Sequence, residues 1–238
     1  HGLTGNNPSV GCVITKNEEI ISIGLTGYGG RPHAESNAIN SCNHDLSGSK
    51  MYVTLEPCNH YGKTSPCSNK IIRKKIKEIF YPINDIDKKV SGKTFKILKS
   101  KKIIVKKGLL KNEAKIFYKS YIFNRKKGMP YVTGKIAMSK NNLIYSKNKK
   151  EITDINSKKF THYLRYKNDS ILISYKTLNN DNPELTCRLK KLNKFSPIRV
   201  ILDNKLDIDT KSYIFKTSNK KNTIIFYNKA NKKKMSLL

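Results

Sequence analysis

Acidic residues are scarce in this sequence: Asp and Glu number 17 against 48 Lys and Arg, which gives a formal net charge of +31. Such a charge is typical of proteins that bind nucleic acid through its phosphates. The lysines are nevertheless spread along the whole chain, whereas a functional basic patch is expected to cluster. We therefore expect no specific nucleic-acid partner, and we expect the charge to favour anionic small ligands such as phosphorylated substrates.

Long apolar runs and a disulfide pattern are also missing. No run approaches the roughly 20 residues that a membrane span needs, so we expect no membrane contact. The five cysteines have no framework spacing, and an odd number of thiols is typical of a reducing compartment. No signal peptide is visible at His1-Gly2-Leu3. We expect a cytoplasmic protein.

The 238 residues suffice for two domains, and the first half alternates strand-like and helix-like segments. The predicted strands are 10–15, 19–23, 50–55, 78–82 and 103–107. The predicted helices are 32–42, 66–75, 93–101 and 111–125. This alternation predicts a layered α/β domain.

One His and two Cys residues stand out by their surroundings. Glu35 follows His33 by two positions, and a proline precedes both Cys58 and Cys67. One imidazole and two thiolates fill three positions of a tetrahedral zinc ion and leave the fourth open to water, as in catalytic zinc sites. Glu35 is not needed as a ligand, so its carboxylate can carry a proton from that water to a leaving amine. Nucleobase deaminases use this pattern, and we predict a zinc-dependent deaminase.

A lone His or Cys is more often a packed core residue than a ligand, so the combination carries this prediction. The spacing departs from the usual one, because residues 59–66 separate the cysteines where most zinc deaminases have two residues. Two alternatives stay open. One is a deaminase of nucleic acid or of a free nucleobase, and the long insert argues against nucleic acid. The other is a non-catalytic zinc-stabilised domain, which Glu35 disfavours.

Three stretches of the first half carry a resemblance to a known family. They are 7–13 (NPSVGCV), 30–35 (GRPHAE) and 53–67 (VTLEPCNHYGKTSPC). They resemble the deaminase half of the bifunctional deaminase–reductases of riboflavin biosynthesis, and a weaker resemblance continues to the end of the chain. It implies a cytidine-deaminase-like three-layer α/β/α domain over 1–127, followed by a dihydrofolate-reductase-like α/β domain over 128–238.

The resemblance also implies a reaction. It is the hydrolytic deamination of 2,5-diamino-6-ribosylamino-4(3H)-pyrimidinone 5′-phosphate, coupled in the family to NADPH-dependent reduction of the product's ribosyl group. The insert between the cysteines offers His60, Lys63 and Thr64 for this substrate, since a Lys with a hydroxyl neighbour suits a ribose phosphate. The resemblance implies a base-reading amide at Asn7. The alternatives are a solvated loop for the insert and a turn-forming asparagine for Asn7.

In the second half, the resemblance implies two sets of contacts. The implied substrate contacts are Lys149, Arg165, Leu185 and Arg188. The implied NADP contacts are Ala137, Glu151, Thr177, Asp181 and Asn204. The alternative interpretations are that Arg165 only caps a helix end and that 181–183 only forms a turn. The predicted elements here are strands at 131–138, 170–174, 197–203 and 223–227, and a helix that ends near residue 168.

This half departs from the family where a cofactor would bind. Residues 139–142 (SKNN) replace Ser-Leu-Asp-Gly, 148–151 (NKKE) replace Gly-x-Ser-x-Trp, and 174–176 (SYK) replace a Gly-rich loop. Glycine lets a backbone approach a dinucleotide closely, so we expect NADPH to bind poorly. The sequence also looks as if the family's first helix and last strands were absent. Because an unpaired sheet edge favours association, we expect a homo-oligomer.

Overall fold

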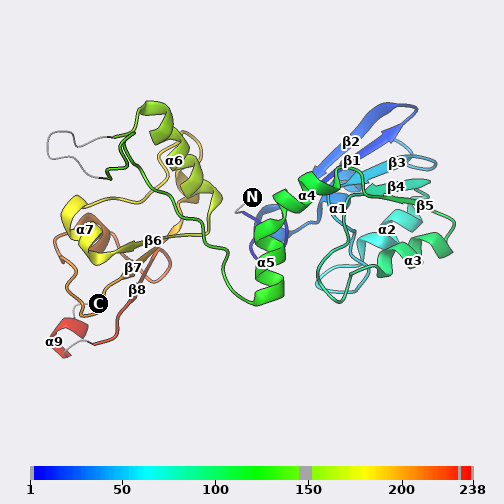
Figure 1. Cartoon of the computed structure of the whole chain (residues 1–238). Coiled ribbons are helices and arrows are strands. Elements are labelled where there is room, and N and C mark those ends of the chain that lie inside the picture. Colours follow the sequence, from blue (N-terminus) through cyan, green and yellow to red (C-terminus); the bar gives the residue numbers. More distant parts are fainter. Residues whose placement is uncertain (1–2, 145–151, 230–231, 237–238) are drawn as a thin grey trace. The chain divides into compact units, whose positions relative to one another are not determined.

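The computed structural model describes residues 3–144, 152–229 and 232–236, and the chain divides into two compact units, Leu3–Gly134 and Lys135–Leu238 (Figure 1). Each unit has its own sheet and its own buried core. The division falls close to the predicted boundary after residue 127, which stays a prediction. In the described part of the chain, no helix is long and apolar enough to cross a membrane.

The first unit contains a five-stranded mixed sheet in the order β2-β1-β3-β4-β5. Its strands are β1 (Gly11–Lys16), β2 (Glu19–Leu25), β3 (Lys50–Val53), β4 (Glu78–Tyr81) and β5 (Ile104–Lys107). Strand β1 runs antiparallel to β2 and β3, whereas β3, β4 and β5 are parallel. The β1–β2 turn has positive φ at Asn17 and Glu18, which matches the twist of a two-residue hairpin.

Three helices cover one face of this sheet: α1 (Ala34–Ser41), α2 (Cys67–Arg73) and α3 (Lys93–Ser100) (Figure 1). A short 3-10 turn, η1 (Tyr28–Gly30), precedes α1. The core consists of alternate strand residues, including Ile14, Met51 and Ile79. They pack against helix residues that include Ile71 and Leu98. Fully burying each such side chain contributes about 1.5–3 kcal/mol. Helix α1 lies directly on β2 because Gly24 has no Cβ, which would collide with the backbone of Ala34 and Ala38.

The segment 111–125 is helical as predicted, apart from an interruption at Tyr118. The structure has two helices, α4 (Lys111–Phe117) and α5 (Lys119–Lys127), which meet at Tyr118. Tyr118 is 1% exposed, its hydroxyl donates to the Ser9 carbonyl at 2.9 Å, and it lies 2.7 Å from the Thr54 hydroxyl. These contacts hold the ring in the interior and set the direction of α5.

The second unit contains a parallel sheet in the order β6-β7-β8. The strands are β6 (Ser170–Ser174), β7 (Ile198–Leu202) and β8 (Thr223–Phe226). The helices are α6 (Ile155–Lys167), α7 (Tyr175–Asp181), η2 (Asn193–Phe195), α8 (Tyr213–Lys216) and α9 (Lys232–Met235). Leu178, Leu185, Ile201 and Ile214 form the buried core. The mixed α/β fold class is confirmed for the chain, and the strands predicted near 170, 198 and 223 are present.

The strand predicted over 131–138 is wrong, because the structure has coil there. Val132 is 83% and Ile136 is 63% exposed. A run of β-branched residues forms a strand only where a neighbour supplies hydrogen bonds and a face becomes buried. In the part of the chain that the structure describes, no strand pairs with this segment.

Candidate metal centre and catalytic cavity

His33 and Glu35 are placed by the start of α1. His33 is the N-cap residue, in extended conformation, after a cis peptide bond between Arg31 and Pro32. Glu35 lies in the first helical turn and is 4% exposed. Burial raises the pKa of Glu35 to about 7, and the charge of Cys58 acts in the same direction. The His33 and Glu35 side chains therefore lie together at the start of α1, as expected from the helix predicted over 32–42.

The two thiols are held by the start of α2. Cys67 is its first residue, whereas Cys58 lies in the loop after β3. In space, however, the Cys67 N–H donates to Cys58 Sγ at 3.2 Å. The Cys67 thiol, the His33 ring and this N–H lower the pKa of Cys58 to about 4. The pKa of Cys67 is raised, because its thiol donates to Cys58 and is buried.

The spacing of the three candidate ligands fits zinc. His33 Nδ1 lies 3.5 Å from Cys58 Sγ and 3.5 Å from Cys67 Sγ, and all three atoms lie within 4.8 Å of one another. Zn–S bonds of about 2.3 Å and Zn–N bonds of about 2.0–2.1 Å at a tetrahedral angle separate N and S by about 3.5 Å. The donor set is also the one that zinc prefers, so the residues fit the metal.

A second layer of side chains surrounds Cys67. Lys70 Nζ donates to Ser36 Oγ at 2.9 Å, and Ser36 Oγ lies 4.0 Å from Cys67 Sγ. Ser36 is buried in α1, and Lys70 lies one turn into α2. Outer partners of this kind orient metal ligands and tune their charge.

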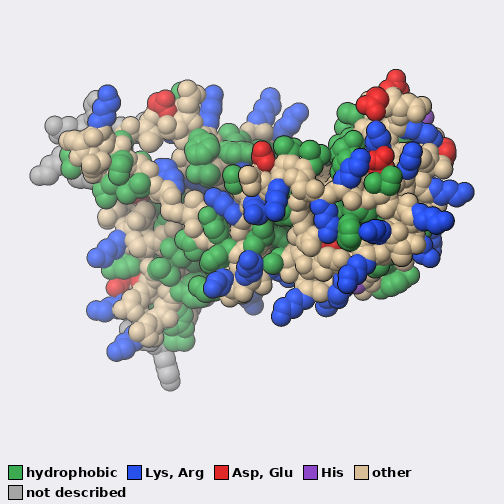
Figure 2. Space-filling view, turned by 45° about the vertical axis from the view of Figure 1, so that its right-hand side comes forward, with side chains coloured by type: hydrophobic (Ala, Val, Ile, Leu, Met, Phe, Trp, Pro, Cys, Tyr) green, Lys and Arg blue, Asp and Glu red, His purple; other side chains and the backbone are tan. Residues whose placement is uncertain are grey.

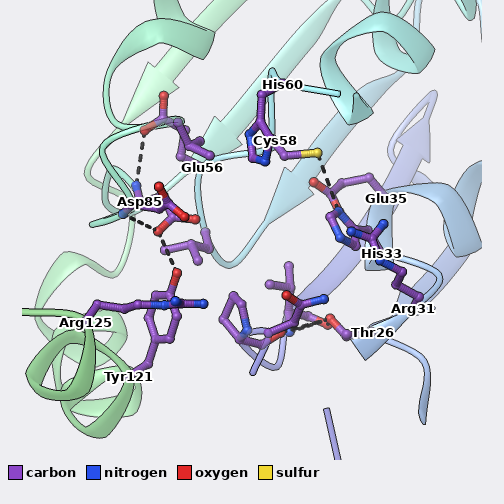
Figure 3. Close-up of a pocket in the computed structure, with 16 residues that line it drawn as sticks. Thr26, Arg31, His33, Glu35, Glu56, Cys58, His60, Asp85, Tyr121 and Arg125 are labelled. Atoms are coloured by element: carbon purple, nitrogen blue, oxygen red, sulfur yellow. Dashed lines mark hydrogen bonds between the residues drawn. The ribbon is translucent and has the colours of Figure 1, made fainter. Parts of the chain in front are cut away.

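Two of the candidate ligands, His33 and Cys58, face a cavity of about 110 Å³ (Figure 3). Glu35, His33 and Cys58 line one side of it. His60, which follows Cys58, also lines it, and its Nδ1 is buried with no hydrogen-bond partner among the described residues. A polar ligand would find both a reactive carboxylate and an unused ring nitrogen here.

The opposite side of the cavity is polar and was missed by the sequence analysis. Tyr121 from α5 donates its hydroxyl to Asp85 Oδ1 at 2.8 Å, and the Arg125 guanidinium lies over the Tyr121 ring at 5.5 Å (Figure 3). Asp85 and Asp87 follow β4, which is parallel to β3. Since parallel strands end at the same edge of a sheet, carboxylates after β4 were a usable signal. The position of α5 beside the cavity depends on the break at Tyr118, and no sequence signal indicated that break.

The four substrate residues predicted in the first unit fall into two pairs. Asn7 and His60 line the cavity, although Asn7 Nδ2 already donates to the Gly30 carbonyl at 2.9 Å. Lys63 and Thr64 are exposed in the insert and do not line it. Thr64 Oγ1 accepts from Arg31 Nη1 at 2.8 Å, and Arg31 lines the cavity.

The predicted substrate residues of the second unit are partly brought together. Arg165 Nη1 donates to the Thr186 carbonyl at 3.0 Å, and the Arg188 N–H donates to His162 Nδ1 at 3.1 Å. Leu185 instead belongs to the buried core. Lys149 lies outside the described residues.

The predicted NADP contacts are spread over separate segments. Ala137 lies in the coil before α6, Thr177 and Asp181 lie in the first turn and at the end of α7, and Asn204 follows β7. The Asn204 carbonyl accepts from the N–H groups of residues 228 and 229. Glu151 lies outside the described residues.

Comparison with known proteins covers both units. Residues 1–83 match the cytidine and deoxycytidylate deaminase zinc-binding region, and residues 130–238 match the RibD C-terminal domain. The chain is 39% identical over 209 residues to riboflavin biosynthesis protein RibD of Bacillus amyloliquefaciens, covering 87% of this chain and 56% of that protein. It is 42% identical over 127 residues to the diaminohydroxyphosphoribosylamino-pyrimidine deaminase of Buchnera aphidicola, covering 53% of this chain and 86% of that protein.

Solved structures show the same relationship. The deaminase/reductase of Thermotoga maritima superposes with a TM-score of 0.85 at 35% identity and covers 96% of this chain and 66% of that one. The chain thus spans somewhat over half the length of the curated relatives, 56% for the Bacillus protein and 65% for RibD of Aquifex aeolicus. Because the likeness runs through both units and includes the zinc-binding region, the chain belongs to the family of riboflavin-biosynthesis deaminase–reductases.

Proposed function

We propose that this chain carries out the zinc-dependent hydrolytic deamination of 2,5-diamino-6-ribosylamino-4(3H)-pyrimidinone 5′-phosphate in riboflavin biosynthesis. The observation that carries this proposal is the group of three ligand atoms at zinc spacing, which opens on a cavity lined by a buried carboxylate. The names of the Buchnera and Thermotoga relatives support the substrate class. The free thiols of all five cysteines are consistent with a cytoplasmic location, which we propose as well.

The residues divide the chemistry between them. His33, Cys58 and Cys67 would hold a zinc ion, which would supply a Lewis acid that makes water a nucleophile near neutral pH. The Glu35 carboxylate takes a proton from the water that adds to the ring carbon bearing the amine. Glu35 then gives this proton to the amino nitrogen, which leaves as ammonia, while the second proton of the water passes to the neighbouring ring nitrogen and the ring carbon becomes a carbonyl. Water replaces the amine, so the reaction needs no redox partner.

Substrate binding in this proposal uses the cavity and the exposed insert outside it. Asn7 and His60 contact the pyrimidine, since both line the cavity beside the metal group. Lys63 and Thr64 hold the ribose phosphate from outside, where the exposed insert and Arg31 supply positive charge and a hydroxyl group. The roles of these residues are predictions that single substitutions can test.

Substrate choice tests the proposed function. The zinc-loaded chain is offered the diaminopyrimidinone phosphate, free cytidine and a cytosine-containing single-stranded oligonucleotide, and ammonia release is measured. We expect rapid release from the first compound and at least about 100-fold slower release from the others, because a pocket that hydrogen-bonds its substrate strongly rejects a substrate that lacks the matching groups. Faster release from cytidine or the oligonucleotide would favour the alternative deaminase.

The high positive charge is expected not to form a nucleic-acid site. In Figure 2 the Lys and Arg side chains are scattered over the visible face and do not form a stripe. Binding to duplex and single-stranded oligonucleotides should be weak and should fall steeply as salt is added, as for counterion release without specific contacts. Fluorescence anisotropy at physiological salt measures it. Nanomolar binding there would contradict this prediction.

NADPH is expected to bind poorly to the second unit, although the family's reductase domain implies this cofactor. Strand β6 leads directly into α7, and Ser174 Oγ accepts the Thr177 N–H at 3.3 Å. The amide that could meet a phosphate is therefore already used, and the side chains of Tyr175 and Lys176 stand where glycines would allow close approach. Titration followed by NADPH fluorescence tests this.

Saturable binding of NADPH in the low micromolar range, with its oxidation by the deaminated product, would show that the second unit is competent as a reductase.

We also propose a homo-oligomer, which light scattering tests. Ile23 and Leu25 on β2 support it, because they are 60% and 67% exposed at the edge of the first sheet.

A further inference from the structure

A second buried carboxylate lies close to the metal group and has no part in the chemistry above. Glu56 lies between β3 and Cys58 and is 3% exposed. In the described part of the chain, no Lys or Arg forms an ion pair with it. A buried carboxylate without a cationic partner must be satisfied by hydrogen-bond donors.

Three backbone N–H groups satisfy Glu56, and all come from one segment that includes the start of α3. Oε2 accepts from Asp85 at 3.1 Å and from Gly92 at 2.9 Å, and Oε1 accepts from Thr94 at 3.2 Å. These donors span the segment 85–94, which connects β4 to α3. One side chain therefore fixes both ends of this segment.

The residues next to Glu56 bind the same segment. The Thr94 hydroxyl donates to the Pro57 carbonyl at 2.7 Å. Asn59 Nδ2 donates to Thr94 Oγ1 at 2.8 Å and to the Val90 carbonyl at 3.0 Å. Residues 56, 57 and 59, which flank the candidate ligand Cys58, thus all contact the loop that follows β4.

The tethered segment is a wall of the cavity. Asp85, Asp87 and Val90 line it, and Asp85 lies across from Glu35 and His33 (Figure 3). We propose that Glu56 is a positioning residue that fixes the 85–94 wall relative to the metal group and so sets how tightly the substrate is held. This inference rests on the proposed deaminase function. Glu56 itself contacts the wall through backbone amides and takes no proton in the reaction.

The substitution Glu56→Gln tests the tether. Gln keeps the shape but turns one acceptor into an NH₂ group, which then faces an N–H donor. We expect KM for the diaminopyrimidinone phosphate to rise at least about 10-fold and kcat to change less than about 3-fold, because the wall binds substrate and Glu35 is untouched. Zinc content should stay at one per chain. Hydrogen exchange of the 85–94 amides should accelerate at least about 10-fold.

Glu19→Gln is the matched control, because Glu19 is an exposed carboxylate on β2. It should leave KM, zinc content and exchange unchanged. Thr94→Val is a second variant that removes the hydroxyl bonded to Pro57 and Asn59 but keeps the amide bonded to Glu56. It should raise KM by about 3-fold or more.

Two results would overturn the inference. One is a folded, zinc-loaded Glu56→Gln protein with the wild-type KM and wild-type exchange at 85–94. The other is a loss confined to kcat, which would assign Glu56 to the chemistry instead of the wall. If Glu56→Gln does not fold, a wild-type KM and exchange in Thr94→Val overturn it. Failure of the wild type to deaminate the substrate would remove the proposed function, whereas exchange at 85–94 reports on the tether independently.

Discussion

Replacing Glu35 by Gln is expected to lower the rate of deamination by about 10²- to 10⁴-fold, the usual contribution of a positioned acid–base group. Gln has nearly the same shape, so it can occupy the buried first turn of α1. Its amide cannot accept a proton from water or pass one to the leaving amine. Ammonia release on the diaminopyrimidinone phosphate measures the effect, and metal analysis of the same sample shows whether zinc is retained at one per chain.

Glu19→Gln again serves as the control, because it removes an exposed carboxylate of the same unit that does not line the cavity. It should deaminate at the wild-type rate. A Glu35→Gln protein that holds zinc and works within a few-fold of the wild type would exclude Glu35 as the proton shuttle. A variant that loses zinc as well would point to a structural role for the carboxylate.

Replacing Cys67 by Ser is expected to remove zinc. Changes in the outer partners of a metal site alone cost 10- to 100-fold in affinity, so loss of a ligand should cost roughly 100-fold or more. Cys67 also donates the N–H that binds Cys58, and this bond survives because it belongs to the backbone. The remaining thiol and imidazole give only two ligands. Zinc per chain after equilibration with a competing chelator measures the loss.

Cys42→Ser is the matched control, since Cys42 is a half-buried free thiol at the end of α1 and outside the metal group. It should bind zinc as the wild type does. Equal zinc content in the Cys67→Ser and Cys42→Ser proteins would exclude Cys67 from the site and leave the three-ligand account without support.

The metal group could be predicted from the sequence because its signal is local. His33 and Glu35 are fixed by the start of one helix, and each thiol follows a proline, of which Pro66 is the N-cap of α2. The sequence did not reveal that the pKa of Cys58 is lowered by the start of α2, a helix to which Cys58 does not belong. The Cys67 N–H reaches Cys58 Sγ across the insert, and that contact depends on how the insert folds.

The polar wall of the cavity could be predicted only in part. Asp85 and Asp87 follow a strand whose partner leads to Cys58, so their proximity was readable once β3 and β4 were taken as parallel. Tyr121 and Arg125 were not readable. They reach the cavity because Tyr118 interrupts the helix, and Tyr118 is held by Ser9 and Thr54, which are remote in sequence.

In the second unit, the sequence predicted a strand that does not form. Residues 131–138 have strong strand propensity, yet they are coil because pairing and burial decide strand formation more than propensity does. The strands that did form, β6, β7 and β8, are those whose apolar residues meet the core around Leu178 and Ile201. Sequence pattern alone cannot tell which apolar runs will find such neighbours.

Titrating zinc into metal-free protein while following ammonia release from the diaminopyrimidinone phosphate tests the central claim most directly. The account predicts that activity is absent without metal, rises in proportion to added zinc and reaches a plateau at one zinc per chain, because His33, Cys58 and Cys67 form one site. Full activity in the metal-free protein would contradict it. So would a folded chain that binds one zinc and releases no ammonia from this substrate.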